Sequence, residues 1–142
     1  MADLNGEYRH KLDAKGRLSL PSKLRSDLSD TLVVMVNPKS ECLYAFTAPE
    51  DFDAWMVSVF EKDGGFNPSN SQHVNVRRVL KSRAVNVAID GANRINLGAG
   101  QREAVQIDKD VVLVGNTGYF EIWDAKRWDE FCNEVDVASF FD

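Results

Sequence analysis

The chain has 142 residues, of which 44% are hydrophobic and 27% are charged, and its net charge at pH 7 is −5. Its longest apolar runs, residues 32–36 and 111–114, are too short to span a bilayer, and its N-terminus lacks the basic and apolar regions of a secretory signal. Cys42 and Cys132 do not have the spacing of a metal site, and their wide separation favours the interpretation that both are reduced thiols in a cytoplasmic protein. We expect no membrane association, and one domain or two small packed ones.

The charge is distributed unevenly along the chain. The negative balance argues against nucleic-acid binding, but affinity for DNA follows the local field and not the sum over the molecule. Acidic residues gather in residues 50–61 and 124–142. In residues 9–25, only Asp13 opposes six cations, which are Arg9, Lys11, Lys15, Arg17, Lys23 and Arg25. This pattern predicts one basic face on an acidic body.

The sequence contains an internal repeat at an offset of 77 residues. Residues 12–21 (LDAKGRLSLP) align with residues 89–98 (IDGANRINLG), and in both segments an aspartate, an arginine and an apolar-polar-apolar ending recur. The offset also relates Arg25 to Arg102. A repeat of this length predicts two copies of one structural module.

Both copies predict the same order of elements. An alternating strand enters a turn that opens with aspartate, a second strand and a short helical turn follow, and two more strands complete the copy. Gly16 and Asn93 suit a left-handed backbone in the two turns. The expected strands are residues 8–12, 17–20, 32–36 and 43–46 in the first copy and residues 85–89, 94–97, 111–114 and 120–123 in the second.

A helix is expected to close each copy. Thr47 and Glu50 form the pattern of a capping box before the first helix, and Asp124 is the expected N-cap of the second. Aromatic and aliphatic residues follow at helical spacing, which predicts core packing for both stripes. The stripes are Phe52, Trp55, Met56, Val59 and Phe60 in the first helix and Trp128, Phe131, Cys132 and Val135 in the second.

Residues 63–71 are polar and rich in turn formers, which predicts a flexible link between the copies. A short helix is expected over residues 73–83, with a cluster of cations on it. We favour a solvated helix face, or ion pairs with the acidic helices, over direct contact of this cluster with DNA. The cations are Arg77, Arg78, Lys81 and Arg83.

The two aspartate turns are the candidate functional features. Asp13 and Asp90 can accept backbone N–H groups or pair with a nearby arginine, and Gly16 allows the turn, so that these three residues fix the loops. The cations around such a loop would then reach phosphates or guanine edges. The candidate DNA contacts are Lys15, Arg17, Arg9, Lys23, Arg25 and Arg94. The alternative is that Arg17 and Arg94 only pair with the aspartates.

The residues give little support for catalysis. Asp13 and Asp90 could form a paired-carboxylate site if the repeat brought them together, which leaves a small enzyme as a competing hypothesis. However, His10 and His73 lack zinc-ligand spacing, and no glycine-rich phosphate-binding motif is present. We therefore predict no enzyme activity, no metal, no cofactor and no small-molecule substrate.

Two distant segments resemble one family. Residues 6–8 and 12–21, together with residues 108–115 and 120–124, resemble the signatures of the MraZ family of bacterial transcriptional regulators, and the similarity spans roughly residues 5–135. In the second copy, Asn93 and Gly98 stand where the family usually has glycine and proline. These departures put DNA contact by the second copy in doubt more than its fold.

The resemblance implies an α+β fold of duplicated SpoVT/AbrB-like swapped-hairpin β modules with pseudo-two-fold symmetry, each with a capping helix. It also implies a homo-oligomeric ring that binds promoter direct repeats in double-stranded DNA, represses the division and cell-wall gene cluster, and associates with the nucleoid. In that family the first aspartate turn carries DNA contact, which implicates Lys15 and Arg17, with Arg94 as their counterpart.

The expected organisation is a first module at residues 5–50, a helix and linker at 51–81, a second module at 82–126, and a C-terminal helix and tail at 127–142. The competing function is that of an oligomeric scaffold or antitoxin-like protein-binding module without DNA contact. The acidic character of the chain and the altered second turn favour this alternative.

Overall fold

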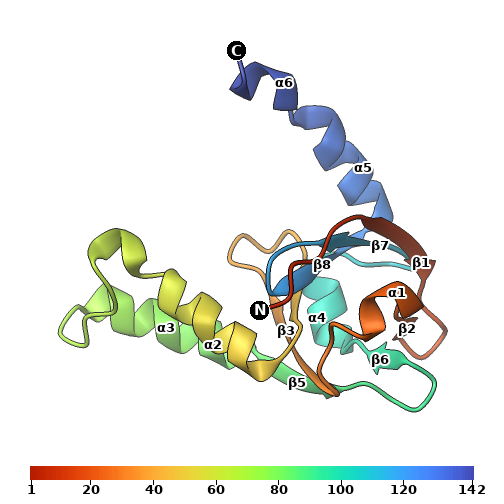
Figure 1. Ribbon diagram of the computed structural model, residues 1–142, viewed down its shortest axis with the longest axis horizontal. Coiled ribbons are helices and arrows are strands. Elements are labelled where there is room, and N and C mark those ends of the chain that lie inside the picture. The colour runs from red at the N-terminus through yellow and green to blue at the C-terminus, as the bar shows by residue number, and fades with distance from the viewer.

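The structure, a computed structural model, describes all 142 residues. A six-stranded antiparallel sheet forms the body, a two-stranded ribbon lies against it, and two helical elements project from it (Figure 1). The strands are β1 (Glu7–Lys11), β2 (Arg17–Ser19), β3 (Thr31–Val36), β4 (Leu43–Phe46), β5 (Val85–Ala88), β6 (Arg94–Asn96), β7 (Asp110–Gly115) and β8 (Tyr119–Asp124). The helices are α1 (Ser22–Arg25), α2 (Pro49–Ser58), the 3-10 turn η1 (Glu61–Asp63), α3 (Ser71–Arg83), α4 (Ala99–Ala104), α5 (Ala125–Glu134) and α6 (Val137–Phe140).

The two halves of the chain exchange strands. The sheet order is β1-β7-β8-β4-β3-β5, so each half places its first strand at the edge of the sheet, paired with a strand of the other half. The ribbon also joins the halves, because β2 pairs with β6. If each strand is replaced by its counterpart in the other half, the same strand order results, read from the opposite edge of the sheet. The expected α+β fold of intertwined, duplicated modules is confirmed, and the strands agree with their expected ranges within two residues.

The main core lies on one face of the sheet and contains side chains from both halves. Leu43 and Ala45 of β4 meet Phe120 and Ile122 of β8 in a cluster of 18 buried residues. Leu18 of β2 is completely buried in the same cluster and closes it from the ribbon side. Neither half can bury its apolar residues alone, which explains why the halves interleave.

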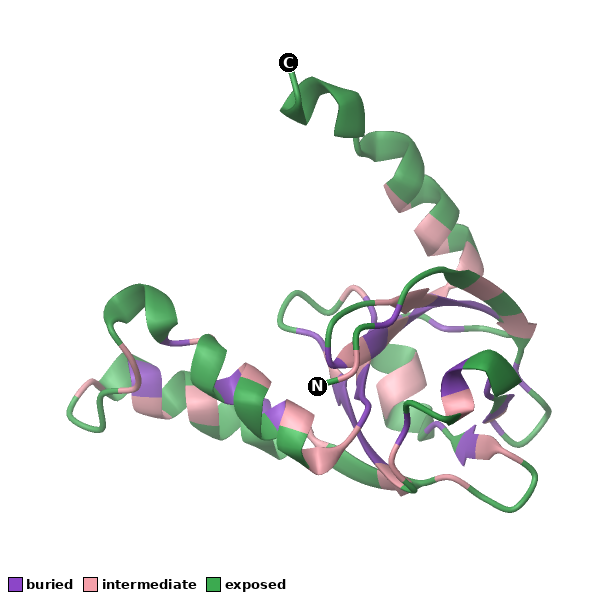
Figure 2. Cartoon of the chain, viewed as in Figure 1, coloured by how far each residue is buried: buried purple, intermediate pink, exposed green.

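A second, smaller core holds the helical hairpin of α2 and α3 against the other face of the sheet (Figure 2). Phe46 of β4 packs against Phe52 of α2, with their ring centroids 5.3 Å apart. The segment between the helices is ordered by the buried His73, whose Nε2 lies 2.8 Å from Asp63 and whose Nδ1 accepts the Asn67 N–H at 3.1 Å. The expectation of a flexible link is therefore wrong, because this histidine fastens the segment.

The two closing helices begin differently. Asp124 caps α5 as expected, because its carboxylate accepts the Arg127 N–H at 3.3 Å. The prediction of a capping box for α2 is wrong. Ala48 occupies the N-cap without a side-chain bond, and the Thr47 hydroxyl donates instead to the carboxylate of Asp51. Glu50 makes no hydrogen bond to the helix start.

Only the first turns of α5 pack on the body. Trp128 and Phe131 contact Trp123 of β8, with ring centroids 5.3 and 5.0 Å away, but Cys132 and Val135 are exposed. The predicted core packing of this stripe is wrong beyond Phe131, because the helix continues past the sheet (Figure 2). None of the helices combines the length and apolarity needed to cross a bilayer.

Removing a core side chain beside the pseudo-two-fold axis should destabilise both halves together. Phe120 is completely buried between them, so Phe120→Ala is expected to lower the free energy of unfolding by about 3–5 kcal/mol. Urea denaturation measures this change, and Lys39→Ala, at an exposed loop position, serves as the control with an expected change within about 0.5 kcal/mol. Two separate unfolding transitions for Phe120→Ala would contradict a shared core.

Candidate nucleic-acid interface

The ribbon places polar side chains from both halves on one outer face. In its antiparallel register Arg17 lies opposite Asn96, and Ser19 lies opposite Arg94. Successive side chains of a strand point to opposite faces, and Leu18 faces the core. The outer face therefore carries two arginines, one from each half, at diagonally opposite positions, and a serine and an asparagine occupy the other diagonal.

Loop 1, residues 12–16, is fixed by the carboxylate of Asp13. One of its oxygens accepts the backbone N–H groups of Lys15 and Arg17, each at 2.9 Å. The other accepts Nε of Arg17 at 2.6 Å. One aspartate thus closes the turn and aims the arginine that follows it.

The Arg17 guanidinium keeps free donors. Its Nε is held by Asp13, whereas its two Nη groups donate no hydrogen bond within the protein, and its side chain is one-third exposed. The two readings of Arg17, ion pair or ligand contact, are compatible in this geometry. Asp13 can orient the guanidinium while the outer Nη groups remain available to a ligand.

Loop 2, residues 89–93, repeats this construction. One oxygen of Asp90 accepts the N–H groups of Ala92 and Arg94 at 2.9 Å, and the other accepts Nε of Arg94 at 3.1 Å. Asn93 takes the place of glycine with a φ of 61°, and its amide donates to the Leu20 carbonyl at 3.1 Å. The second aspartate turn therefore forms despite the departure at this position.

Each loop is braced by the other half of the chain. The carbonyl of Gly16, which has a φ of 79°, accepts the Leu97 N–H at 3.0 Å, and the Asn93 carbonyl accepts the Leu20 N–H at 2.9 Å. Arg102 packs against Gly16 and donates from Nε to the Leu97 carbonyl at 3.1 Å. Arg102 was not among the candidate residues. Its match to Arg25 at the repeat offset is the signal that could have found it.

The pKa values of both turn aspartates are lowered. The backbone N–H of Arg17 is the main cause for Asp13, and the backbone N–H of Arg94 is the main cause for Asp90. Hydrogen bonds to the charged form favour ionisation. Both carboxylates are therefore charged at neutral pH and hold their arginines in place.

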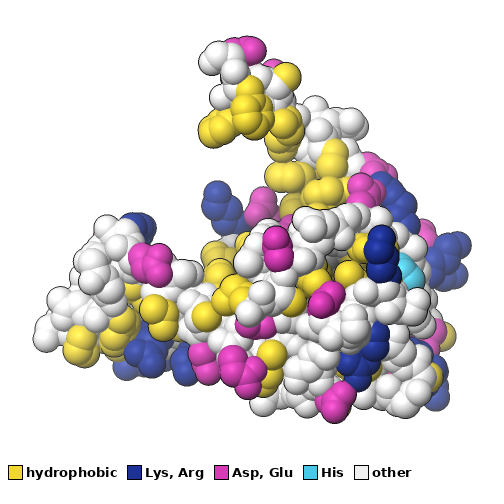
Figure 3. Space-filling model, in the orientation of Figure 1, with side chains coloured by type: hydrophobic (Ala, Val, Ile, Leu, Met, Phe, Trp, Pro, Cys, Tyr) yellow, Lys and Arg dark blue, Asp and Glu magenta, His cyan; other side chains and the backbone are white.

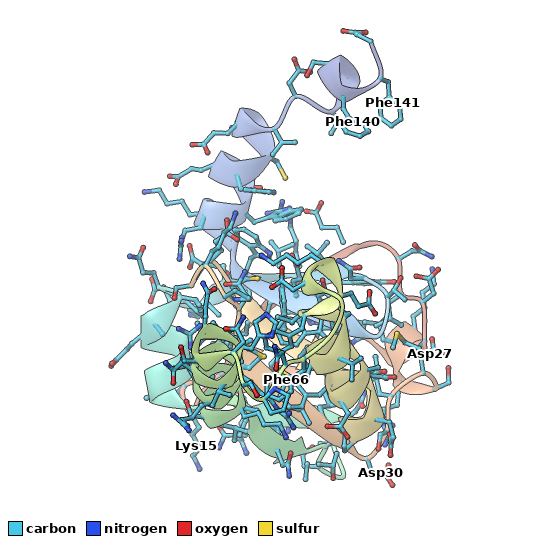
Figure 4. The ribbon with its side chains drawn as sticks, turned by 90° about the vertical axis from the view of Figure 1, so that its left-hand side faces the viewer. Lys15, Asp27, Asp30, Phe66, Phe140 and Phe141 are labelled. Carbon is cyan, nitrogen blue, oxygen red and sulfur yellow. The ribbon has the colours of Figure 1, made fainter.

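Two lysines remain without partners beside the ribbon. The Lys15 side chain lies at the tip of loop 1 and makes no hydrogen bond or ion pair, and Figure 4 shows it at the periphery of the molecule. Lys23 is exposed on α1, which directly follows β2. These two cations can move toward a polyanion without breaking an internal contact.

Two other candidate arginines are already paired. Arg25 bonds Asp30 at 2.7 Å and the Leu28 carbonyl at 3.0 Å. Arg9 lies 2.7 Å from both Glu7 and Asp129, and the hydrogen bond that it donates to Asp129 is the main cause that raises its pKa. The structure therefore groups Arg9 with α5 and not with the ribbon.

The basic cluster of α3 is also separate from the ribbon, because α3 projects from the opposite side of the body (Figure 1). None of its cations forms an ion pair. Arg77 lies over the Phe66 ring at 4.6 Å, Arg78 donates to Asn75, and Arg83 donates to the Asn37 carbonyl. Within one chain the cluster is therefore a solvated helix face, as expected. The ion pairs with acidic helices that the sequence also allowed do not form.

The geometry removes the paired-carboxylate hypothesis. Asp13 and Asp90 lie in separate turns, and each is bonded to the backbone and arginine of its own loop. No group of three or more His, Cys, Asp or Glu side chains is arranged to hold a metal ion. The chemistry available at the ribbon is hydrogen bonding and charge attraction by outward-facing cations.

Acid should release the loops only at low pH. Because folding lowers the pKa of Asp13, its stabilisation is complete above the unfolded value of about 4 and is lost as the pH falls through the folded value. The amide resonances of Lys15 and Arg17 should therefore stay constant between about pH 8 and pH 5 and move only below about pH 4. Asp13→Asn should abolish that titration. A midpoint near neutral pH would refute the anchoring role.

Comparison with known proteins places the chain in a family. Residues 4–55 and 80–142 match the family described as "MraZ protein, putative antitoxin-like". A "Transcriptional regulator MraZ" of Symbiobacterium thermophilum is 38% identical over 92% of this chain and 90% of its own length. Its namesake in Mycoplasmoides gallisepticum is 34% identical over 95% of this chain and 90% of its own length. With this coverage and with the two-module fold, the chain belongs to the MraZ family.

Proposed function

We propose that this chain is a sequence-specific DNA-binding transcriptional regulator that contacts duplex DNA through the outer face of the β2–β6 ribbon. The observation that carries the proposal is the pair of arginines, Arg17 and Arg94, that project from one face while aspartates hold their Nε groups. The names of the relatives as transcriptional regulators support it.

The ribbon has dimensions suited to a DNA groove. The major groove is about 12 Å wide and admits a two-stranded β ribbon. The register separates Arg17 and Arg94 by two residues along the ribbon, which corresponds to about 7 Å. Two guanidinium forks at this spacing can bind neighbouring phosphates or base edges, while Ser19 and Asn96 supply neutral donors beside them.

The two loops contribute unequally in this proposal. Loop 1 carries Lys15 at its tip and is followed by Lys23, whereas Gly91, Ala92 and Asn93 of loop 2 are uncharged. Because Lys15 and Lys23 have no internal partner, they can approach flanking phosphates at little cost. Loop 1 therefore supplies most of the attraction to the backbone, and Arg94 adds one contact from loop 2. Arg25 can join only by leaving Asp30, and Arg9 is not part of the interface.

Binding to DNA also depends on how many chains assemble and on which sites they engage. A single ribbon offers few contacts, so useful affinity requires several copies to engage adjacent sites together. We propose that a homo-oligomeric ring of chains binds direct repeats in a promoter, represses the division and cell-wall genes there, and associates with the nucleoid. The boundaries of the two modules, residues 5–50 and 82–126, also stay predictions.

A second candidate function is that of an antitoxin-like module that binds a protein partner without DNA. The description of the matching family contains this term, and the negative net charge favours it modestly. Duplex binding by the purified chain separates the two candidates.

Removing one anchored arginine should weaken DNA binding sharply. Each good arginine contact contributes about 1–3 kcal/mol, so Arg17→Ala is expected to reduce affinity for the DNA upstream of the chain's own gene by roughly 10- to 100-fold. Arg94→Ala should have a smaller effect. A gel-shift titration measures both. The matched control is Lys62→Ala, which removes a cation from η1 at the far end of the helical hairpin. Equal binding by Arg17→Ala and Lys62→Ala would contradict the proposed interface.

The salt dependence of binding tests the lysine at the loop tip. Each phosphate neutralised contributes about −0.9 to the slope of log affinity against log salt. Lys15→Ala should therefore make the slope less steep by about 0.9 per engaged subunit, without a change in the preferred DNA sequence. Fluorescence anisotropy at several salt concentrations measures this slope, and an unchanged slope would exclude Lys15 as a phosphate contact.

A further inference from the structure

The C-terminal helices form an arm, residues 125–142, whose apolar edge has no partner within the chain beyond Phe131. Beyond Phe131 the edge continues through Cys132, Val135 and Val137. It ends at Phe140 and Phe141, which are 85% and 79% exposed. Figure 3 shows the hydrophobic side chains gathered on one side of the arm. Contiguous exposed apolar surface of this kind marks an interaction site.

A second unpartnered surface lies on α3. A shallow groove of about 410 Å³ runs along this helix, with Val59 and Leu80 at its floor and Val76 and Val79 at its margin. Val76 is 39% exposed and Val79 is 50% exposed. We call this surface the α3 groove. It is open, apolar and large enough to receive side chains from another helix.

The two surfaces carry opposite charge. From Trp128 to the C-terminus the arm has no Lys or Arg and five acidic residues, which are Asp129, Glu130, Glu134, Asp136 and Asp142. Helix α3 has no acidic residue and four cations, which are Arg77, Arg78, Lys81 and Arg83. None of those four cations pairs with a carboxylate, and on the arm only Asp129 has an ion-pair partner, Arg9. An apolar strip thus faces solvent on each element, and the net charges of the two elements are opposite. Arg83 lines the α3 groove itself, whereas Arg77 and Lys81 lie on the side of α3 that faces α2.

The arm and the helical hairpin of α2 and α3 project from the body in different directions (Figures 1 and 4), and no hydrogen bond or ion pair joins them. An arm can therefore meet a complementary groove on a second copy of the chain. Because the arm and the α3 groove are different surfaces, their contact is heterologous and adds one chain after another. Such a contact produces a ring when its rotation closes.

We infer that the arm of one copy docks in the α3 groove of the next copy, with Phe140 and Phe141 against Val76 and Val79 and with the acidic flank of the arm along the cations of α3. This contact would hold together the assembly that the proposed function requires. It uses surfaces distinct from the ribbon, so it can be tested separately from DNA binding.

Two variants each remove one half of the contact. The arm variant is Phe140→Ser with Phe141→Ser, and the groove variant is Val76→Glu with Val79→Glu; all four positions are exposed, so each chain should keep its fold. By analytical ultracentrifugation the wild type is expected to form a closed oligomer, and each variant alone should be monomeric. An equimolar mixture of the variants should form a particle of two chains, because one intact arm and one intact groove remain.

Several outcomes overturn the inference. A monomeric wild type, a variant that keeps the wild-type mass, or a mixture that stays monomeric while circular dichroism shows both variants folded would each exclude this contact. Dimers of the groove variant alone would indicate pairing between arms. Binding of the wild type to vesicles of phosphatidylcholine and phosphatidylglycerol, lost in the arm variant without any change of mass, would assign the arm to a membrane surface instead.

A labelling experiment keeps the test valid if a variant fails to fold. Cys42 is buried, and desolvation raises the pKa of its thiol, whereas Cys132 is exposed on the apolar edge of the arm. A maleimide should therefore label one site, and docking should slow the reaction of Cys132 in the wild-type oligomer at least tenfold relative to the protein diluted to monomers. Equal rates in the two states would contradict coverage of the arm.

The experiment also distinguishes failure of docking from failure of DNA binding. Both variants retain the ribbon, so they should bind a duplex with a single promoter repeat as weakly as one wild-type subunit, and should lose only the gain from adjacent repeats. Loss of single-repeat binding in the groove variant, with its mass unchanged, would assign α3 to DNA and overturn the inference. Correct assembly of a wild type that ignores DNA would leave docking in place and refute the proposed function.

Discussion

The carboxylate of Asp13 is the contact on which the proposed interface depends. It binds two backbone N–H groups of its own turn and Nε of Arg17, so that a single side chain determines both the shape of loop 1 and the direction of its arginine. A surface arginine without such an anchor samples many rotamers, and ordering them on binding has an entropic cost. Asp90 repeats the arrangement in loop 2. The two arginine side chains thus lose their conformational entropy when the protein folds, before a ligand binds.

The interleaved fold makes this local arrangement rigid. Each loop carbonyl accepts a hydrogen bond from a residue of the other half, and Arg102 of the second half packs beneath Gly16 of the first. The ribbon that carries both arginines seals the shared core through Leu18 and Ile95. Movement of either loop would therefore disturb packing in both halves. A rigid two-stranded ribbon with outward cations is suited to the proposed contact with a long and regular polyanion.

The repeat in the sequence was sufficient to predict the modules, the strands and the two aspartate turns, because strand alternation and turn chemistry are local signals. The partner that each polar side chain selects was not accessible in the same way. The capping box at Thr47 was not formed because the Thr47 hydroxyl donates to Asp51, and the order of residues 63–71 comes from the buried His73 that follows them. The helical period of the second closing helix correctly predicted an apolar face, formed by Trp128, Phe131, Cys132 and Val135. The period does not indicate whether the residues that pack on this face belong to the same chain. The pairing of Arg9 with Asp129 likewise required the fold.

A crystal structure of the protein bound to a duplex with its promoter repeat would show directly whether the ribbon contacts DNA through the anchored Arg17. We expect the β2–β6 ribbon to lie against the DNA, with an Nη group of Arg17 about 2.7–3.2 Å from a phosphate or guanine oxygen while its Nε remains hydrogen-bonded to Asp13. A complex in which the ribbon faces solvent and the duplex lies along α3, or in which Arg17 leaves Asp13 to reach the DNA, would contradict this expectation.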